Sequence, residues 1–251
     1  MTEPSPALWT VPHLTTALTG PLLRLESQLL QAQVAIEGWF RDQFRATPAP
    51  VYCSVDLRNA GFKLAPVDTN LFPAGFNNLG ERFLPLCVQA MQVALERVCP
   101  RASRVLLVPE NHTRNLFYLE NVAALRRIVE AAGYAVRIGS LLPDLAEPQT
   151  VQLPSGASLL LEPVQRHGNR VGVAGFDPCL VLLNNDLSAG RPAILEGIEQ
   201  TIAPPMALGW CQRRKSEHFG QYRDVAREFG ALIELDPWFI DPYFRQCGQV
   251  D

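Results

Sequence analysis

The sequence lacks the features that mark membrane proteins, secreted proteins and nucleic-acid-binding proteins. Its longest apolar runs, such as CLVLL, are far shorter than the roughly 18 residues that a membrane-spanning helix needs. The N-terminus, MTEPSPALW, has no basic segment followed by an apolar stretch, so no signal peptide is predicted. The net charge of −3 gives no electrostatic reason to expect nucleic acid as a partner. We therefore expect a cytoplasmic protein without membrane or nucleic-acid partners.

The familiar catalytic signatures are also missing. The chain contains no HExxH, no GxSxG, no GxxxxGK[ST], and no GxGxxG after its first strand. Its six cysteines are scattered without a CxxC pair, which argues against a disulfide framework and against a structural metal site. A serine or cysteine hydrolase and a zinc enzyme are therefore unsupported, and no metal ligands are assigned.

What the sequence does contain is an alternation of strand-like and helix-like segments. The predicted elements are strands over 104–110, 134–139 and 179–186, and helices over 20–44, 81–98, 115–132 and 217–229. Residues 151–173 differ, because short strands and turn residues follow one another there at hairpin spacing. This pattern predicts an α/β fold with a mostly parallel sheet flanked by helices and a short antiparallel insertion near 151–173.

The segment from Ser54 to Leu79, SVDLRNAGFKLAPVDTNLFPAGFNNL, is predicted to be a long loop that follows a short buried strand, PVYCSVDL. Compact loops of this length are usually functional. Arg58 is suited to holding a carboxylate with two hydrogen bonds, and Lys63 offers a point charge. The asparagines supply donors and acceptors together, as an amino-acid ligand requires. The alternative is that they only form turns, which is their commonest role.

Polar clusters follow the other predicted strands as well. Ligands of open α/β sheets bind outside the carboxyl ends of the strands. The clusters are Asp56–Asn59, Glu110–Asn115, Asn184–Asp186 and Gln212–His218. Two of them have features of anion sites. His112 and Arg114 precede a predicted helix. The three cations Arg213–Lys215 precede Ser216, which is a predicted helix N-cap. The alternative for each is a surface cap or a solvated charged face.

Five segments of the chain closely resemble a proteobacterial type of glutamate–cysteine ligase, also called γ-glutamylcysteine synthetase. The segments are SVDLRNAGFKLAPVDTNLFPAGFNNL, LVPENHTRN, LLNNDLS, APPMALGWCQRRKSEHF and DPWFIDPYF. The resemblance extends over nearly the whole chain from about residue 50. It implies a Rossmann-like, pre-ATP-grasp domain related to the glutathione-synthetase-like ATP-grasp enzymes.

The resemblance also implies a reaction. ATP would phosphorylate the γ-carboxyl of L-glutamate, and the amine of L-cysteine would attack the acyl phosphate, giving γ-glutamylcysteine in the first step of glutathione biosynthesis. Mg²⁺ would neutralise the charge on the phosphates. No catalytic residue is assigned. The expected substrate-binding residues are Arg58, Asn59, Lys63, Asp68, Asn70, Asn77, Asn78, Asn111, His112, Arg114, Asn184 and Asn185. The expected phosphate- or carboxylate-binding residues are Arg213, Arg214, Lys215 and Ser216.

Members of this family are longer, so the chain is expected to be the N-terminal, substrate-side part, with the ATP and Mg²⁺ sites mostly outside it. The expected parts are an N-terminal helical segment (1–49), an α/β domain (50–235) and the start of a linker or helix (236–251) that leads to a C-terminal ATP-grasp part. The apolar cluster at 238–244 would form a surface for that part or a docked C-terminal helix.

Three other interpretations stay open at this point. The chain could be a non-catalytic amino-acid-binding module, an inactive fragment of the ligase, or an interaction domain that docks on a separate ATP-binding chain. The sequence does not predict the oligomeric state.

Overall fold

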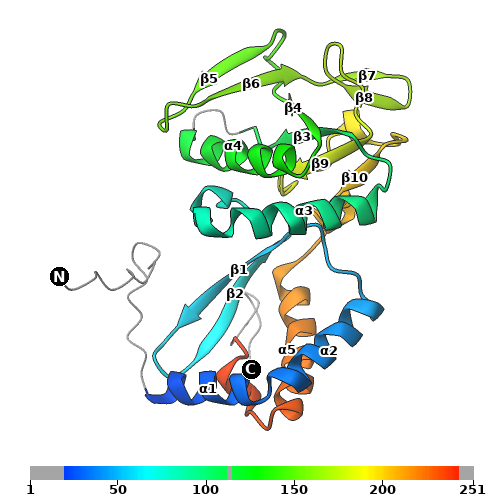
Figure 1. The fold of residues 1–251 in the computed structure, drawn as a ribbon. Coiled ribbons are helices and arrows are strands. Elements are labelled where there is room, and N and C mark those ends of the chain that lie inside the picture. The colour runs from blue at the N-terminus through cyan, green and yellow to red at the C-terminus, as the bar shows by residue number, and fades with distance from the viewer. Residues whose placement is uncertain (1–19, 112–114, 243–251) are drawn as a thin grey trace, which may run out of the picture. The chain divides into compact units, whose positions relative to one another are not determined.

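The computed structural model describes residues 20–111 and 115–242 (Figure 1). These residues form two compact units. The helical unit draws its described residues from 1–48, 55–68 and 216–251, and the sheet unit draws its residues from 49–54 and 69–215. The helical unit is therefore assembled from three separate stretches of the chain.

A six-stranded sheet organises the sheet unit. In spatial order its strands are β10 (Thr201–Ala203), β9 (Leu180–Asn184), β3 (Arg104–Pro109), β4 (Ala135–Ser140), β6 (Ser158–Pro163) and β5 (Gln149–Gln152). All neighbours pair in parallel except β5 and β6, which are antiparallel. A second, two-stranded antiparallel sheet is formed by β7 (Gln165–His167) and β8 (Arg170–Gly172). The predicted α/β fold and its antiparallel insertion are confirmed.

Side chains of β3 alternate between the two faces of this sheet, as the two-residue period of a strand requires. Val105 and Leu107 belong to a core shared with α3 (Leu84–Val98) and α4 (Leu116–Ala131). Leu106 and Val108 belong to a second core, which includes β8 and the segment after β9. Strands buried on both faces read as continuous apolar runs, which is why RVLLVP and LVLLN are recognisable in the sequence.

The helical unit contains four main elements. They are α1 (Gly20–Gln31), α2 (Gln33–Ala46), a two-stranded sheet of β1 (Ser54–Asn59) and β2 (Leu64–Asn70), and α5 (Lys215–Leu232), followed by the single turn η5 (Pro237–Phe239). Leu25, Ile233 and Leu235 form its buried core. Phe239 and Ile240 pack against that core, so part of the apolar C-terminal cluster is docked within this unit. Tyr243 and Phe244 lie outside the described residues.

The predicted long loop of residues 54–79 is wrong in its first part, which forms β1 and β2. The four residues between the strands leave room only for an antiparallel hairpin, because parallel strands need a long crossover. Ala60 N donates to Lys63 O at 2.9 Å, and Gly61 has a φ of 84°, which a side chain would strain. β1 is exposed from Val55 to Asn59, so it is not the buried strand that was expected. Polar side chains on so exposed a strand remain in water, so they cost little free energy of folding.

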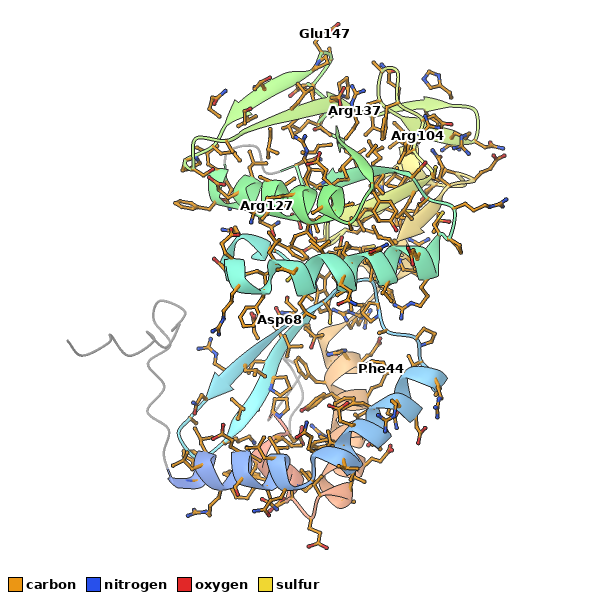
Figure 2. The ribbon with its side chains drawn as sticks, in the orientation of Figure 1. Phe44, Asp68, Arg104, Arg127, Arg137 and Glu147 are labelled. Atoms are coloured by element: carbon orange, nitrogen blue, oxygen red, sulfur yellow. The ribbon has the colours of Figure 1, made fainter. Side chains whose placement is uncertain are left out.

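An ion pair between a half-buried arginine and a buried carboxylate joins β4 and β6, where Arg137 donates two hydrogen bonds to Glu162. Glu162 is only 2% exposed. The hydrogen bonds to this carboxylate raise the pKa of Arg137 above its ordinary value. Figure 2 labels Arg137 among the side chains of the sheet unit. This ion pair satisfies the one buried carboxylate of the described sheet.

Along the described ranges, none of the helices is long and apolar enough to pass through a membrane. The five cysteines that the structure describes are free thiols; they are Cys53, Cys87, Cys99, Cys179 and Cys211.

Candidate functional site

Two of the predicted polar clusters meet at the carboxyl ends of β3 and β9. The two strands are in register with Pro109 opposite Asn184, so Glu110 and Asn185 follow at the same edge of the sheet. Asp186 N donates to the Glu110 carboxylate at 3.3 Å, and Asn185 Nδ2 lies 3.5 Å from Pro109 O. This is the edge at which open α/β sheets bind ligands.

Asn184 is the central residue of this edge and is only 1% exposed. Its Oδ1 accepts hydrogen bonds from Asn121 Nδ2 at 3.0 Å and from the Tyr118 hydroxyl at 3.1 Å. Its Nδ2 donates to Pro73 O at 2.7 Å. Asn121 in turn accepts from Phe76 N at 2.9 Å. The Asn184 amide therefore fixes the segment after β2 to the sheet edge, and both of its polar atoms are used within the chain.

Two tyrosines complete this network and were not found from the sequence. The Tyr118 hydroxyl accepts from Glu110 N at 2.9 Å and donates to Asn184 O at 2.7 Å. The Tyr52 hydroxyl donates to Leu183 O. Burial raises the pKa of both tyrosines well above the ordinary value, and for Tyr118 the charges of Glu110 and Asp186 raise it further. Both side chains are therefore neutral donors at physiological pH.

Replacing Asn184 with alanine is expected to lower the free energy of unfolding by about 2 kcal/mol. The change leaves two buried polar groups, Asn121 Nδ2 and Pro73 O, without their hydrogen bonds to Asn184. An unsatisfied buried polar group costs roughly 1–3 kcal/mol. Urea denaturation of the variant measures the loss. The matched control is Asn77→Ala, an exposed turn residue, which should change stability by less than about 0.5 kcal/mol. Equal losses in the two variants would contradict the role given to Asn184.

The segment after β10 brings cations near the same edge. Trp210 N donates to Asp186 O at 2.8 Å. The Arg213 guanidinium lies 4.0 Å from the centre of the Trp210 ring and donates to Thr69 O at 2.6 Å. The Lys215 ammonium lies 5.3 Å from the same ring. Positive charges held on an aromatic face are favourable and well positioned. Trp210 thus links Arg213 and Lys215 to Asp186, which follows Asn185 at this edge.

The remaining predicted residues of the sheet unit have simpler surroundings. Asn77 and Asn78 are exposed in the single turn η1 (Phe76–Asn78), and Asn111 and Arg214 are exposed. Asn70 and Asn185 each accept a backbone hydrogen bond from the residue two positions later, at 2.8 and 2.9 Å. These are turn contacts of the kind that the alternative interpretation describes. His112 and Arg114 lie outside the described residues.

The expected N-cap at Ser216 is wrong, because α5 begins one residue earlier, at Lys215. Ser216 therefore lies in the first turn of the helix. Its hydroxyl is not placed to cap the helix in the way that the sequence pattern suggested.

A cavity of about 810 Å³ lies within the helical unit, between α1 and the β1–β2 hairpin. Most of its lining is apolar, and the polar lining residues are Glu26, Asp56, Arg58 and Asn59. Arg58 forms no ion pair with any other residue that the structure describes. A guanidinium with two carboxylates nearby matches the carboxylate and ammonium of an amino acid. The volume falls in the range of about 300–1,000 Å³ that small-ligand sites occupy.

Two candidates of the hairpin, Asn59 and Lys63, have contacts at or next to its turn. Asn59 Oδ1 accepts from Gly61 N at 2.8 Å. The Lys63 ammonium lies 4.7 Å from the centre of the Trp238 ring, which stacks on Phe62 at 5.9 Å. Lys63 and Asp68 do not line the cavity. The predicted site residues are therefore divided between a cavity in the helical unit and a sheet edge in the sheet unit.

The side chains that could bind a metal ion are dispersed. Within 20–111 and 115–242, no group of three or more His, Cys, Asp and Glu side chains is placed to hold a metal ion.

The mostly parallel sheet and the polar residues at the carboxyl ends of β3 and β9 define the class of open α/β proteins, which bind ligands at this edge. The sequence matches the family described as glutamate-cysteine ligase over residues 26–251. That match covers most of the sequence, and the chain belongs to the glutamate–cysteine ligase family.

The structure is similar to a crystal structure from Methylobacillus flagellatus KT described as "Putative gamma-glutamylcysteine synthetase". The two chains are 59% identical with a TM-score of 0.89, over 96% of this chain and 57% of the other. This chain therefore spans a little more than half the length of that protein. Comparison with curated protein sequences found no significant match.

Proposed function

We propose that the chain is the substrate-side part of an ATP-dependent ligase that joins the γ-carboxyl of L-glutamate to the amine of L-cysteine. The product would be γ-glutamylcysteine, made in the cytoplasm as the first step of glutathione biosynthesis. The observation that carries this proposal is membership of the glutamate–cysteine ligase family over residues 26–251. The cavity beside Arg58 supports it, since its charges suit an amino acid.

In this proposal the cavity of the helical unit holds the α-amino and α-carboxylate groups of one amino acid. Arg58 donates two parallel hydrogen bonds to the carboxylate, and Glu26 or Asp56 accepts from the ammonium. The apolar side chains from α1 and β2 exclude water from the rest of the ligand.

The sheet edge takes the second charged group in this proposal. Asn111 and Asn185 offer amides at the carboxyl ends of β3 and β9, and Arg213 and Lys215 offer positive charge. These groups would hold a carboxylate or phosphate and offset its charge. The buried network of Asn184, Tyr118 and Asn121 keeps the edge in place.

ATP, bound with Mg²⁺, supplies the phosphoryl group that turns the γ-carboxylate into a reactive acyl phosphate. We assign the ATP and Mg²⁺ sites mostly to sequence outside this chain, since this chain spans only 57% of the crystal structure to which it is similar. The contribution of this chain is to bind and orient the amino acids.

The activity is tested by measuring ADP. The purified protein, incubated with ATP and Mg²⁺, should release ADP only when L-glutamate and L-cysteine are both present. Calorimetry of glutamate binding, with and without ATP and Mg²⁺, provides the second measurement. ADP release that does not depend on the amino acids would contradict the ligase. Amino-acid binding that is indifferent to nucleotide would favour a non-catalytic binding module instead.

A further inference from the structure

A second cavity, of about 390 Å³, lies in the sheet unit at the end of β3 away from the candidate edge. β3 begins at Arg104, which lines this cavity, and ends at Pro109, next to the candidate edge. At roughly 3.3 Å per residue, the two ends of this strand are about 15–20 Å apart. The cavity is therefore separate from the site discussed above. Its other walls come from β8, the end of β7 and the turn that follows β8.

The charged residues that line this cavity are Arg104, Arg170 and a single carboxylate, Asp177, and His167 also contributes to the lining. Asp177 is already neutralised, because Arg170 Nε donates to its Oδ1 at 3.0 Å and Arg170 Nη2 lies 2.9 Å from the same oxygen. Arg104 forms no ion pair with any residue in the described part of the chain. One positive charge is thus left over at the cavity wall.

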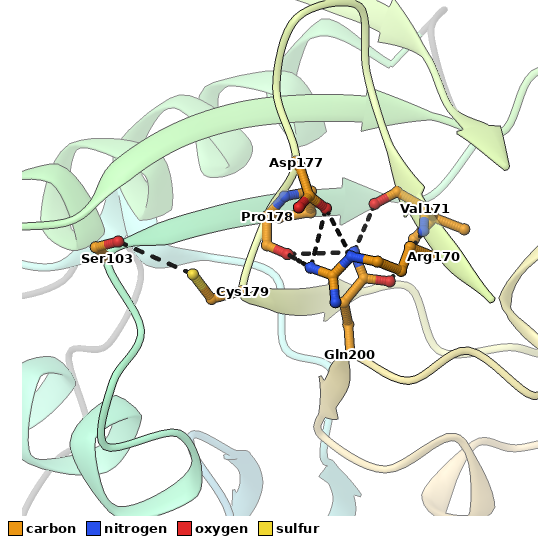
Figure 3. A network of polar contacts seen from close by, with 7 residues as sticks. All are labelled: Ser103, Arg170, Val171, Asp177, Pro178, Cys179 and Gln200. Atoms are coloured by element: carbon orange, nitrogen blue, oxygen red, sulfur yellow. Dashed lines mark hydrogen bonds and ion pairs between the residues drawn. The ribbon is translucent and has the colours of Figure 1, made fainter. Parts of the chain in front are cut away.

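The arginine that pairs with Asp177 is held rigidly. Arg170 Nη2 also donates to Pro178 O at 3.0 Å. Gln200, only 5% exposed, accepts from Val171 N at 2.9 Å and donates to Val171 O at 2.6 Å. Figure 3 shows how these contacts tie β8 to the residues before β9. A wall fixed in this way loses little conformational entropy when a ligand binds.

The turn after β8 is equally constrained. Val173 and Phe176 exchange two backbone hydrogen bonds, at 3.2 and 2.9 Å. A Cβ atom on Gly172 would lie 2.4 Å from Phe176 O, so the turn folds back closely on the strand. Val171 and Val173 are buried, and the Phe176 ring is partly exposed. The partly exposed Phe176 ring is therefore the apolar side chain that the cavity offers to a ligand.

The neighbouring thiol gives independent support for an environment that favours negative charge. Hydrogen bonds from Ser103 and Arg104 hold the pKa of Cys179 below its ordinary value. The Ser103 hydroxyl and the Cys179 sulfur are 3.9 Å apart (Figure 3).

We propose that this cavity binds a small organic oxyanion, a phosphate monoester or a carboxylate, with its charged group against Arg104 and its apolar body against Phe176. A guanidinium without a carboxylate partner is suited to two parallel hydrogen bonds with such a group. The adjacent Phe176 ring suits a small aromatic or aliphatic body. The inference does not depend on the ligase proposal, because it uses none of the same residues.

The test uses the intact chain and four probes, followed by two-dimensional ¹H–¹⁵N NMR of the Gly172, Val173 and Gly175 amides. Phenyl phosphate and benzoate separate the two kinds of oxyanion. Inorganic phosphate lacks the apolar body, and phenol lacks the charge. Saturable shifts of these amides are expected with phenyl phosphate or benzoate, with weaker binding of inorganic phosphate and none of phenol. Absence of shifts with both organic anions, or equal binding of phenol, would overturn the proposal.

Arg104→Gln is expected to weaken binding of the preferred probe at least about tenfold, because glutamine keeps a neutral donor but loses the charge and the forked geometry that hold the oxyanion. The matched control is Arg101→Gln, which removes an equal charge from an exposed residue three positions earlier that does not line the cavity. That variant should bind the probe as the parent does. Equal weakening by the two changes would show a general charge effect and would overturn the specific site. An unchanged affinity in Arg104→Gln would do the same.

Discussion

Replacing Arg58 with alanine is expected to weaken amino-acid binding about 100-fold. In the proposed complex Arg58 makes two charge-assisted hydrogen bonds to the α-carboxylate, and losing them costs roughly 3 kcal/mol. Arg58 is exposed on β1 and has no ion-pair partner among the described residues, so its removal should leave the fold intact. Calorimetric titration with L-glutamate and with L-cysteine shows which amino acid depends on Arg58.

Two further variants sharpen this test. Arg24→Ala removes an exposed arginine of α1 that does not line the cavity, so its affinity should match that of the parent chain. Arg58→Lys keeps the charge but loses the forked geometry, and should fall between the two. If Arg58→Ala binds both amino acids as tightly as Arg24→Ala does, Arg58 is not a substrate residue.

Replacing Arg137 with alanine is expected to lower the free energy of unfolding by about 3–5 kcal/mol. The change leaves the buried Glu162 carboxylate without its partner, and an uncompensated buried charge is strongly destabilising. Arg137 also lies 5.7 Å from the centre of the Phe176 ring, so packing is lost with the charge. Chemical denaturation monitored by circular dichroism measures the effect.

The comparison for this prediction is an exposed ion pair. Arg126 and Glu130 lie 2.7 Å apart on the surface of α4, and such pairs contribute at most about 1 kcal/mol. Arg126→Ala should therefore cost far less than Arg137→Ala. The double change Arg137→Leu with Glu162→Leu should recover most of the lost stability, because an apolar pair can replace a buried ion pair. A loss below about 1 kcal/mol in Arg137→Ala would refute the role of the pair.

Most of the sheet unit could be predicted because its signals are local. β3 and β9 are continuous apolar runs followed by polar residues, as strands buried on both faces are. The ends of α4 also have local sequence signals. Asn115 caps the N-terminus by accepting from Tyr118 N at 3.1 Å, and Gly133 follows the C-terminus with a φ of 97°. The β1–β2 hairpin could not be found in this way. β1 is exposed from Val55 to Asn59, and the buried residues of β2, Ala65 and Pro66, are consecutive, so no apolar alternation appears.

The candidate site was predictable where it depends on strand ends. Glu110 and Asn185 meet because neighbouring parallel strands finish at one edge. The residues behind them were missed, because Tyr118 and Asn121 sit in an apolar helix pattern where a polar residue normally indicates the solvent face. The oxygens of Asn59, Asn70 and Asn185 show a different limit. Sequence identifies an asparagine as a possible ligand group, but the local turn that uses its oxygen depends on backbone geometry.

The discontinuous make-up of the helical unit has a consequence for synthesis on the ribosome. Its described residues come from 1–48, 55–68 and 216–251, whereas the sheet unit is almost continuous over 69–215. α1 and the hairpin therefore emerge long before α5, whose Phe229 packs with their Leu25 and Leu64. Domains generally fold as units during translation. The sheet unit is expected to fold first, while the apolar faces of the N-terminal helices are still exposed to solvent. We expect a nascent-chain chaperone to bind these helices.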